Sequence, residues 1–437
     1  MCLHSYIKLI FLVLIMKKVV LIGGGFAGIN IITRLSNNSN FEITLVDKNN
    51  YNFFPPLIYQ VSSSILDPAA ITYPFRRFIR HKKNVKFRLA ELLEIKSDEN
   101  KVVLSNGELD YDILIIATGT QSNYFGMENL EKYAFPMKTL NDALLLRNIL
   151  LERLEAASRE TDLIEKKRLL SIVITGGGPA GVEIAGVIRE IINYIENVDY
   201  KDLKGEIQVY LVEGSPVLLG PMSDKSHKEA YRALNNLGVK ILVNTQVKDC
   251  DENTIYFSNG DKIETKTIIW TAGVTSRIFE GIPKEVYGKG RRMQVDAHNK
   301  VQGFSNIYAI GDTCIMTTDP NFSAGHPQLA QVAIQQGKNL ANNLINQITN
   351  NNFQPKPFRY KDRGSMAVIG RNKAVADLIH PTLFLKGLPA WIIWSSIHLI
   401  SLVSIGNRLN TLYRWLTIYI SKNSSLGSAY KIGDPRP

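Results

Sequence analysis

Cysteine is scarce in this sequence of 437 residues, which contains only Cys2, Cys250 and Cys314. No two of them stand at the spacing of a metal-binding motif or of a redox-active pair. This excludes a dithiol relay of the CxxC kind, predicts no metal site, and fits a reducing compartment.

The N-terminus lacks a long hydrophobic run. The apolar run from Leu9 to Met16 is too short to span a bilayer, which takes about 20 residues, and no small-residue cleavage site follows it. Met16-Lys17-Lys18 followed by an apolar strand is a typical start for a folded domain. We therefore expect residues 1–15 to be an extension or a start-site artefact.

Charged residues make up 21% of the chain and hydrophobic residues 45%, which excludes a disordered protein. The length predicts several domains, since one domain usually takes about 100–200 residues. Net charge is +11, and the excess is concentrated from Lys356 onward, where twelve Lys and Arg face three Asp. Such a tail suits either nucleic acid or an anionic membrane surface, so the residues between the charges must decide.

The residues between the charges of this tail indicate binding to a membrane and not to nucleic acid. Leu388 to Ile405 carries no Lys, Arg, Asp or Glu, although Pro389 and several serines weaken a transmembrane reading. Further on, apolar residues fall on one helical face, namely Leu409, Leu412, Tyr413, Leu416 and Ile420. We predict a monotopic helix pair lying on one leaflet and no nucleic-acid partner. The alternative that these helices close a dimer or a core remains open.

A strand, a glycine turn, a helix and a second strand follow one another from Lys18. Gly23-x-Gly25-x-x-Gly28 lies in the turn, and Asp47 ends the second strand about 20 residues later. Glycines allow a tight turn and close approach to a pyrophosphate, and an acid at this place can bind the ribose hydroxyls. A lone GxGxxG is a weak indication of a nucleotide site, but here the strand, the helix and the acid all stand at the expected places around it. The predicted nucleotide-contacting residues also include Phe26, Ala27 and Lys48.

The same unit recurs at Gly176-x-Gly178-Pro179-x-Gly181, whose paired strand ends in Glu213. An acid there favours a free ribose 2′-hydroxyl and repels a 2′-phosphate, which predicts NADH rather than NADPH. Glu183 follows in what we expect to be the first helical turn, where a carboxylate would also stabilise the helix dipole. Because apolar strands buried on both faces indicate a parallel sheet, the sequence predicts an α/β protein with two Rossmann-like domains.

With two nucleotide folds, we expect one to bind FAD and the other NADH. Three further apolar strands end in small residues that suit close contact with a cofactor. Asp312, after Gly311, can accept a hydrogen bond from a flavin hydroxyl, although Gly-Asp is also a common bare turn. The predicted contacts at these strand ends are Thr118, Gly119, Ala272, Gly273, Gly311 and Asp312.

From about Lys17 to about Tyr419 the chain resembles the type II, single-subunit and non-proton-pumping NADH:quinone oxidoreductases. The resemblance is carried by the segments NYNFFPPLIYQV from Asn50, AQVAIQQG from Ala330, GSMAVIGR from Gly364 and LPAW from Leu388, together with Asn407-Arg408. Asn52 stands where the family often has His or Gln.

The resemblance implies FAD and NADH as cofactors and a membrane quinone as electron acceptor. It implies that Ala330, Gln331 and Gln335 lie by the flavin ring at the quinone end, Glu183 near the nicotinamide and flavin edge, and Lys373 near the flavin. Without the family, two Gln four residues apart indicate only a solvated helix face.

We therefore predict an FAD-dependent NADH dehydrogenase that reduces a quinone, on the cytoplasmic face of the cell membrane, with a homodimer left open. The predicted domains are an FAD-binding domain of residues 16–135 and 292–350, an NADH-binding domain of 136–291, a linker with strands near the flavin over 351–382, and a membrane-associating segment of 383–437. Sulfide:quinone oxidoreductases and disulfide reductases need paired cysteines that are missing here, and a soluble ferredoxin reductase needs no apolar tail. A non-catalytic, membrane-attached nucleotide sensor remains a rival.

Overall fold

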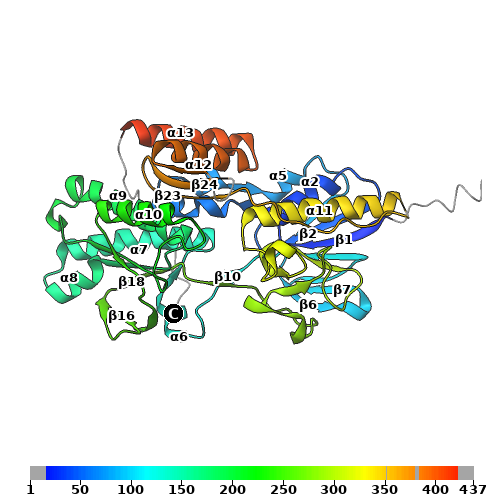
Figure 1. Cartoon of the computed structure of the whole chain (residues 1–437), viewed down its shortest axis with the longest axis horizontal. Helices are drawn as coiled ribbons and strands as arrows, with labels where there is room; N and C mark the ends of the chain where they lie inside the picture. Colours follow the sequence, from blue (N-terminus) through cyan, green and yellow to red (C-terminus); the bar gives the residue numbers. More distant parts are fainter. Residues whose placement is uncertain (1–15, 351, 379–382, 422–437) are drawn as a thin grey trace, which may run out of the picture. The chain divides into compact units, whose positions relative to one another are not determined.

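The structure is a computed structural model that describes residues 16–350, 352–378 and 383–421, so the predicted extension of residues 1–15 lies outside it. Contacts between residues divide the chain into two compact units (Figure 1). Unit 1 comprises Met1–Asn52, Pro74–Gln121 and Thr275–Lys361, and unit 2 comprises Phe53–Tyr73, Ser122–Val274 and Asp362–Pro437. These divisions differ from the predicted domains chiefly in assigning residues 53–73 and the C-terminal segment to the second unit.

Unit 1 is built on a five-stranded parallel sheet of order β21-β9-β1-β2-β5. Its central strands are apolar and buried, as expected for a parallel sheet covered on both faces. Helices α2 (Phe26–Leu35) and α11 (Ala330–Thr349) pack closely together, since a Cβ at Gly337 would lie 2.7 Å from the carbonyl oxygen of Ala27. The strands are β1 (Lys17–Ile22), β2 (Phe41–Asp47), β5 (Val85–Leu89), β9 (Ile113–Ile116) and β21 (Ile307–Ala309).

Smaller elements complete unit 1. A three-stranded antiparallel sheet and a parallel pair of short strands share one hydrophobic core with the main sheet. These elements are β6 (Leu92–Lys96), β7 (Lys101–Leu104), β8 (Gly107–Asp110), β20 (Met293–Val295) and β22 (Cys314–Met316), with the short helix α5 (Phe75–Ile79) beside β5.

Unit 2 repeats the architecture with a parallel sheet of order β11-β18-β12-β13-β14. Its strands are β11 (Phe135–Pro136), β12 (Ser171–Thr175), β13 (Gln208–Val212), β14 (Val239–Leu242) and β18 (Thr267–Trp270). Its helices are α6 (Glu128–Tyr133), α7 (Leu140–Arg159), α8 (Leu163–Leu170), α9 (Pro179–Val198) and α10 (Asp224–Leu237), and a small antiparallel sheet contains β15 (Val247–Cys250), β16 (Thr254–Phe257) and β17 (Lys262–Glu264). Two Rossmann-like units confirm the predicted fold class.

An antiparallel sheet packs on α9 within unit 2. It consists of β23 (Ser365–Gly370), β24 (Lys373–Leu378) and β25 (Leu383–Lys386). The helix and β23 come into backbone contact at Gly186, where an added Cβ would lie 1.7 Å from the carbonyl oxygen of Ile369. Only glycine fits there, and the side chains of α9 on either side of Gly186 are therefore held against β23.

Helices α12 (Leu388–Ser401) and α13 (Ile405–Ser421) lie next to each other in unit 2 (Figure 1). Asn407 of α13 is buried, and its side-chain amide donates hydrogen bonds to the carbonyl oxygens of Ala69, Ala70 and Thr72 at 2.8–3.0 Å. These bonds attach α13 to the chain around α4 (Pro68–Ile71), which follows α3 (Ile58–Ser62). The C-terminal helices are thus part of the packing of unit 2.

The polarity of α13 is the reverse of that of a core helix. Polar Thr411 is fully buried, whereas Leu409, Tyr413 and Leu416 are 63%, 65% and 51% exposed. The predicted apolar face therefore points away from unit 2, and Ile420 lies beyond the side chains that the structure describes. Within residues 16–350, 352–378 and 383–421, the apolar stretches of the helices are too short to span a bilayer.

Candidate functional site

The first glycine turn lies in unit 1, between β1 and α2. Gly23 has a φ of +101°, which a side chain would strain, and a Cβ at Gly28 would lie 2.1 Å from the carbonyl oxygen of Gly23. Gly25, in contrast, has no atom within 4 Å of an added Cβ and stands at the N-cap of α2 without a side-chain capping bond. The space beside Gly25 at the start of α2, next to Phe26 and Ala27, has room for a pyrophosphate.

The second turn, in unit 2, has the same construction. Gly176 has a φ of +100°, and a Cβ at Gly181 would lie 1.8 Å from its carbonyl oxygen. Gly178 again has open space around an added Cβ and caps α9, with Pro179 as the first helical residue. The two motifs predicted from sequence therefore form matching anion cradles.

The two acids also play the same role in their turns. Asp47 accepts hydrogen bonds from the backbone N–H groups of Gly24 and Asn49, both at 2.8 Å. Glu213 accepts from the N–H of Gly177 and, at 2.7 Å, from that of Ser215. Burial raises the pKa of Asp47, and the N–H groups that bind it oppose this shift. Each carboxylate is thus fixed at the edge of its glycine turn, where a ribose would lie.

The other residues predicted to contact a nucleotide fall at strand ends of both units. Thr118 follows β9, and its hydroxyl is hydrogen-bonded to that of Thr313 at 3.3 Å. Gly311 has a φ of +75°, and its N–H donates to the buried Gln336 at 2.7 Å, so α11 fixes the turn that carries Asp312. The remaining strand-end residues are Lys48 and Gly119 in unit 1, and Ala272 and Gly273 after β18 in unit 2.

Gln331 and Gln335 lie in the first turns of α11, at partly exposed positions next to Ala330. Both amide atoms of Gln335 are used by the backbone of Lys361, since its nitrogen donates to the Lys361 carbonyl at 2.9 Å and its oxygen accepts from the Lys361 N–H at 3.1 Å. Gln335 therefore holds the end of unit 1 in place, a structural role that the one-face spacing did not reveal.

Glu183 lies on the α9 face that meets β23. The prediction that it occupies the first helical turn is wrong, because α9 begins at Pro179 and its first turn contains no acid. A stabilising effect of the helix dipole therefore does not explain this carboxylate. It accepts a hydrogen bond from the N–H of Val368 at 3.3 Å and another from the side chain of Trp394. Burial nevertheless raises its pKa to about 8, so the carboxyl is protonated over much of the neutral range.

A cavity of about 100 Å³ opens beside Glu183, within unit 2. It is walled by aromatic rings and contains two carboxyl groups and one amide, a lining typical of a site for a flat organic molecule. Trp415 donates from its ring N–H to Gln60 at 2.7 Å, which connects α13 to α3 across the wall. The aromatic and polar lining residues are Tyr59, Gln60, Glu183, Glu190, Arg371, Trp391, Trp394 and Trp415.

Glu190 was missed in the sequence. It stands two helical turns after Glu183 and accepts a hydrogen bond from the N–H of Arg371 at 2.7 Å. Burial raises its pKa, while the nearby cations Lys373 and Arg371 act in the opposite direction. Lys373, a predicted site residue, therefore lies near Glu190. The spacing of seven residues, which puts two acids on one helix face, was the signal that could have found it.

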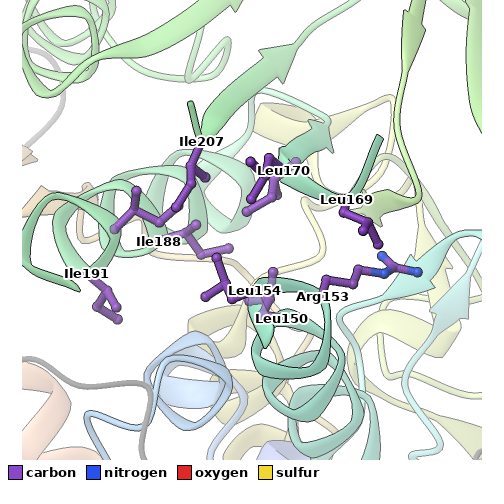
Figure 2. Close-up of a pocket in the computed structure, with 10 residues that line it drawn as sticks. Leu150, Arg153, Leu154, Leu169, Leu170, Ile188, Ile191 and Ile207 are labelled. Carbon is purple, nitrogen blue, oxygen red and sulfur yellow. The ribbon is translucent and has the colours of Figure 1, made fainter. Parts of the chain in front are cut away.

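A second cavity in unit 2 carries no such chemistry. It has a volume of about 20 Å³, room for about one water, and lies among α7, α8 and α9 (Figure 2). Apart from Arg153, whose guanidinium binds the Thr267 hydroxyl, its lining is aliphatic. Among the residues that the structure describes, His, Cys, Asp and Glu form no group of three or more that could hold a metal ion.

Replacement of Glu183 by Gln tests its buried, protonated state. A carboxyl whose pKa is raised by folding stabilises the protein at low pH, and this contribution is lost as the pH rises through the folded value. Relative to Glu183→Gln, the wild type should therefore lose stability between about pH 4.5 and about pH 8. Thermal unfolding midpoints measured from pH 5 to 9 check this, with the exposed Glu152→Gln as control. A constant difference between wild type and Glu183→Gln over this range would contradict it.

Comparison with known proteins agrees with this geometry. The model of the pyridine nucleotide-disulphide oxidoreductase family matches residues 17–337, and that of the NDH2 C-terminal domain matches residues 363–422. The type II NADH:quinone oxidoreductase NdhA of Mycobacterium tuberculosis is 34% identical over 415 residues, which cover 91% of this chain and 86% of the relative. A type II NADH:quinone oxidoreductase of Staphylococcus haemolyticus is 30% identical over 82% of this chain and 89% of its own.

Solved structures show the same fold. NDH2 from Plasmodium falciparum, in complex with NADH, superposes with a TM-score of 0.85 at 23% identity and covers 94% of this chain and all of its own. The sulfide:quinone oxidoreductase of Aquifex aeolicus gives 0.67 at 19% identity, covering 94% of this chain and 93% of its own. The two family models and the curated relatives agree with the matched glycine turns and the tryptophan-walled C-terminal segment, and the chain belongs to the type II NADH:quinone oxidoreductases.

Proposed function

We propose that this protein oxidises NADH and reduces a membrane quinone, with FAD as its resident cofactor. The observation that carries the proposal is the pair of matching glycine turns, each with an open helix N-terminus and a fixed carboxylate, combined with a carboxyl-containing aromatic cavity in the C-terminal part of the chain. Two nucleotides and an aromatic acceptor are the three ligands that these sites suit.

FAD fits the turn of unit 1 and NADH that of unit 2. The N–H groups at the start of α2 would hold the FAD pyrophosphate, Asp47 its ribose, and Asp312 its hydroxyl-bearing chain. The start of α9 and Glu213 would do the same for NADH. When bound, the flavin accepts a hydride from NADH and passes two electrons on to the quinone.

The contribution of the chain's own residues is positioning, exclusion of water and proton supply. Three tryptophans line the cavity, and Glu183 holds a proton there at neutral pH because burial disfavours its charged form. A protonated carboxyl group beside an aromatic cavity can donate a hydrogen bond to a quinone carbonyl and then the proton itself.

The outward apolar face of α12 and α13 suits a lipid surface. Besides the side chains already named on α13, Ile400 and Ile405 are 67% and 71% exposed. Apolar side chains on the outside of two adjacent helices, with Arg408 and Arg414 on the second helix, suit a protein that lies on one leaflet. Since NADH is a cytoplasmic solute, we place this face on the cytoplasmic side of the cell membrane.

The proposed function is tested by mixing the purified protein, loaded with FAD, with NADH and a short-chain quinone. We expect NADH absorbance to fall only when a quinone is present, with one quinol formed for each NADH. A non-catalytic nucleotide sensor would bind NADH and show no turnover. Sulfide oxidation by the same sample, without NADH oxidation, would instead support a sulfide:quinone oxidoreductase.

Glu213 should decide the choice between NADH and NADPH. Its carboxylate would repel a 2′-phosphate, so Glu213→Gln, which keeps an acceptor for the N–H of Gly177, should raise kcat/KM for NADPH about tenfold, equivalent to about 1.4 kcal/mol. Steady-state kinetics with both cofactors measure this, and the exposed Glu252→Gln serves as control. Equal kcat/KM values for the two cofactors in the wild type would contradict the assignment.

Gln331 and Gln335 should give different results when each is changed to Leu. We expect Gln331→Leu to raise the KM for quinone while NADH still reduces the flavin at the wild-type rate. Gln335→Leu should in addition lower stability by about 1–3 kcal/mol, because its two hydrogen bonds to Lys361 are lost. Stopped-flow flavin reduction, quinone kinetics and thermal unfolding separate these effects, with Gln347→Leu on the same helix as control. Loss of flavin reduction in Gln331→Leu would refute its proposed role.

The outer face should hold the protein on membranes. The triple variant Ile400→Ser, Leu409→Ser and Leu416→Ser removes three exposed apolar side chains, each worth about 1.5–3 kcal/mol on burial, so binding to phospholipid vesicles should fall at least about a hundredfold. Sedimentation with vesicles measures this, and NADH oxidation with a water-soluble acceptor should not change. Leu163→Ser with Ile164→Ser, 80% and 59% exposed in the wild type, is the control. Unchanged vesicle binding with loss of a dimer would show that the face closes a homodimer instead.

A further inference from the structure

We infer that Glu190 takes up a proton from solvent and passes it to Glu183 through the cavity that both carboxyl groups line. This inference rests on the proposed function. Reduction of a quinone to a quinol adds two electrons and two protons, and the hydride of NADH accounts for both electrons and one proton. The second proton must come from solvent, and the cavity that both carboxyl groups line offers it a route to Glu183.

The placement of the two acids follows from α9. Seven residues separate them, which is about two turns and about 10 Å along the helix axis, so both project from one face. The backbone contact at Gly186 lies between them, and each acid accepts an N–H from the β23 side, Glu183 from Val368 and Glu190 from Arg371. The helix thus fixes two proton-holding groups along one strand, too far apart for direct transfer.

The cavity bridges this distance. Its volume of about 100 Å³ has room for several waters, since one water needs about 10–15 Å³. Polar partners are available along it, because Gln60 donates to the Tyr59 hydroxyl at 3.1 Å and its other amide atom accepts from Trp415. A short chain of waters between Glu190 and Glu183 would therefore be hydrogen-bonded at both ends and in the middle.

The charged and titratable groups around the two acids differ. Arg371 and Lys373, from the turn and strand after β23, face Glu190 and oppose the rise in its pKa that burial causes. Tyr59 of α3 lies near both carboxyl groups, and burial keeps its hydroxyl protonated by raising its pKa well above the usual value. The lining from α12 and α13 is uncharged. Burial raises the pKa of Glu183 to about 8, so at neutral pH this carboxyl can hold a proton that arrives through the cavity.

The test is Glu190→Gln in the FAD-loaded enzyme, with Glu152→Gln as control. In stopped-flow measurements NADH should reduce the flavin at the wild-type rate, whereas reoxidation by a short-chain quinone should slow at least tenfold and show a larger solvent deuterium isotope effect. Imidazole, a small proton donor, should restore part of the lost rate. A merely structural role for Glu190 would give neither the isotope effect nor the rescue.

A second readout does not depend on turnover. In infrared spectra of the protein recorded from pH 5 to 9, the band of a protonated carboxyl group should persist near neutral pH in Glu190→Gln and be lost in Glu183→Gln. Wild-type reoxidation rates in Glu190→Gln at every pH would overturn the inference, as would loss of the band in that variant.

If Glu190→Gln does not fold, the variant Glu190→Asp tests the proton relay instead. This variant keeps the acid but shortens it, so a proton relay predicts slower reoxidation with a larger isotope effect, and unchanged values overturn the inference. A wild type that does not oxidise NADH with quinone would refute the proposed function itself, which is a separate outcome.

Discussion

Close backbone contact between α9 and β23 at Gly186 is the constraint on which the chemistry of unit 2 depends. A residue with a Cβ would push the strand away from the helix, and Glu183 and Glu190 would then lose the N–H groups of Val368 and Arg371 that orient them. The same contact keeps the hairpin of β23 and β24 under α12, so the tryptophans can wall the cavity. The helical spacing places the two carboxyl groups on one face of α9, and the missing side chain at Gly186 lets that face meet β23.

The two glycine turns have the same backbone geometry, although they lie in different units of the chain. In each, a first glycine takes a positive φ, a third glycine contacts its carbonyl group, and the middle one leaves the helix N-terminus open. In each, an acid at the end of the next strand accepts the N–H of the glycine between the first two. This acid therefore stabilises the turn in addition to its proposed contact with a ribose, so Glu213→Gln disturbs the turn less than a change to a smaller residue.

Helix α13 buries the polar residues Asn407 and Thr411 and exposes the apolar residues Leu409, Tyr413 and Leu416. The side-chain amide of Asn407 donates hydrogen bonds to three backbone carbonyl groups of segment 53–73. The buried amide thereby supplies these carbonyl groups with hydrogen-bond partners. The outward apolar face is then unfavourable in water and favourable on a lipid surface. The exposed apolar face and the cavity wall belong to the same helix, because Trp415 of α13 lines the cavity beside Gln60.

The sequence alone determined the α/β class, the two glycine turns and their acids, and the apolar face of α13. These features depend on residues close together in the chain, whose periodicity and spacing dictate local structure. Only the tertiary structure decided that Gln335 is engaged by Lys361, that Glu183 lies beyond the first turn of α9, and that Glu190 shares its cavity. Those facts depend on contacts between residues far apart in sequence, and the pKa of a carboxyl is set by what such contacts bury around it.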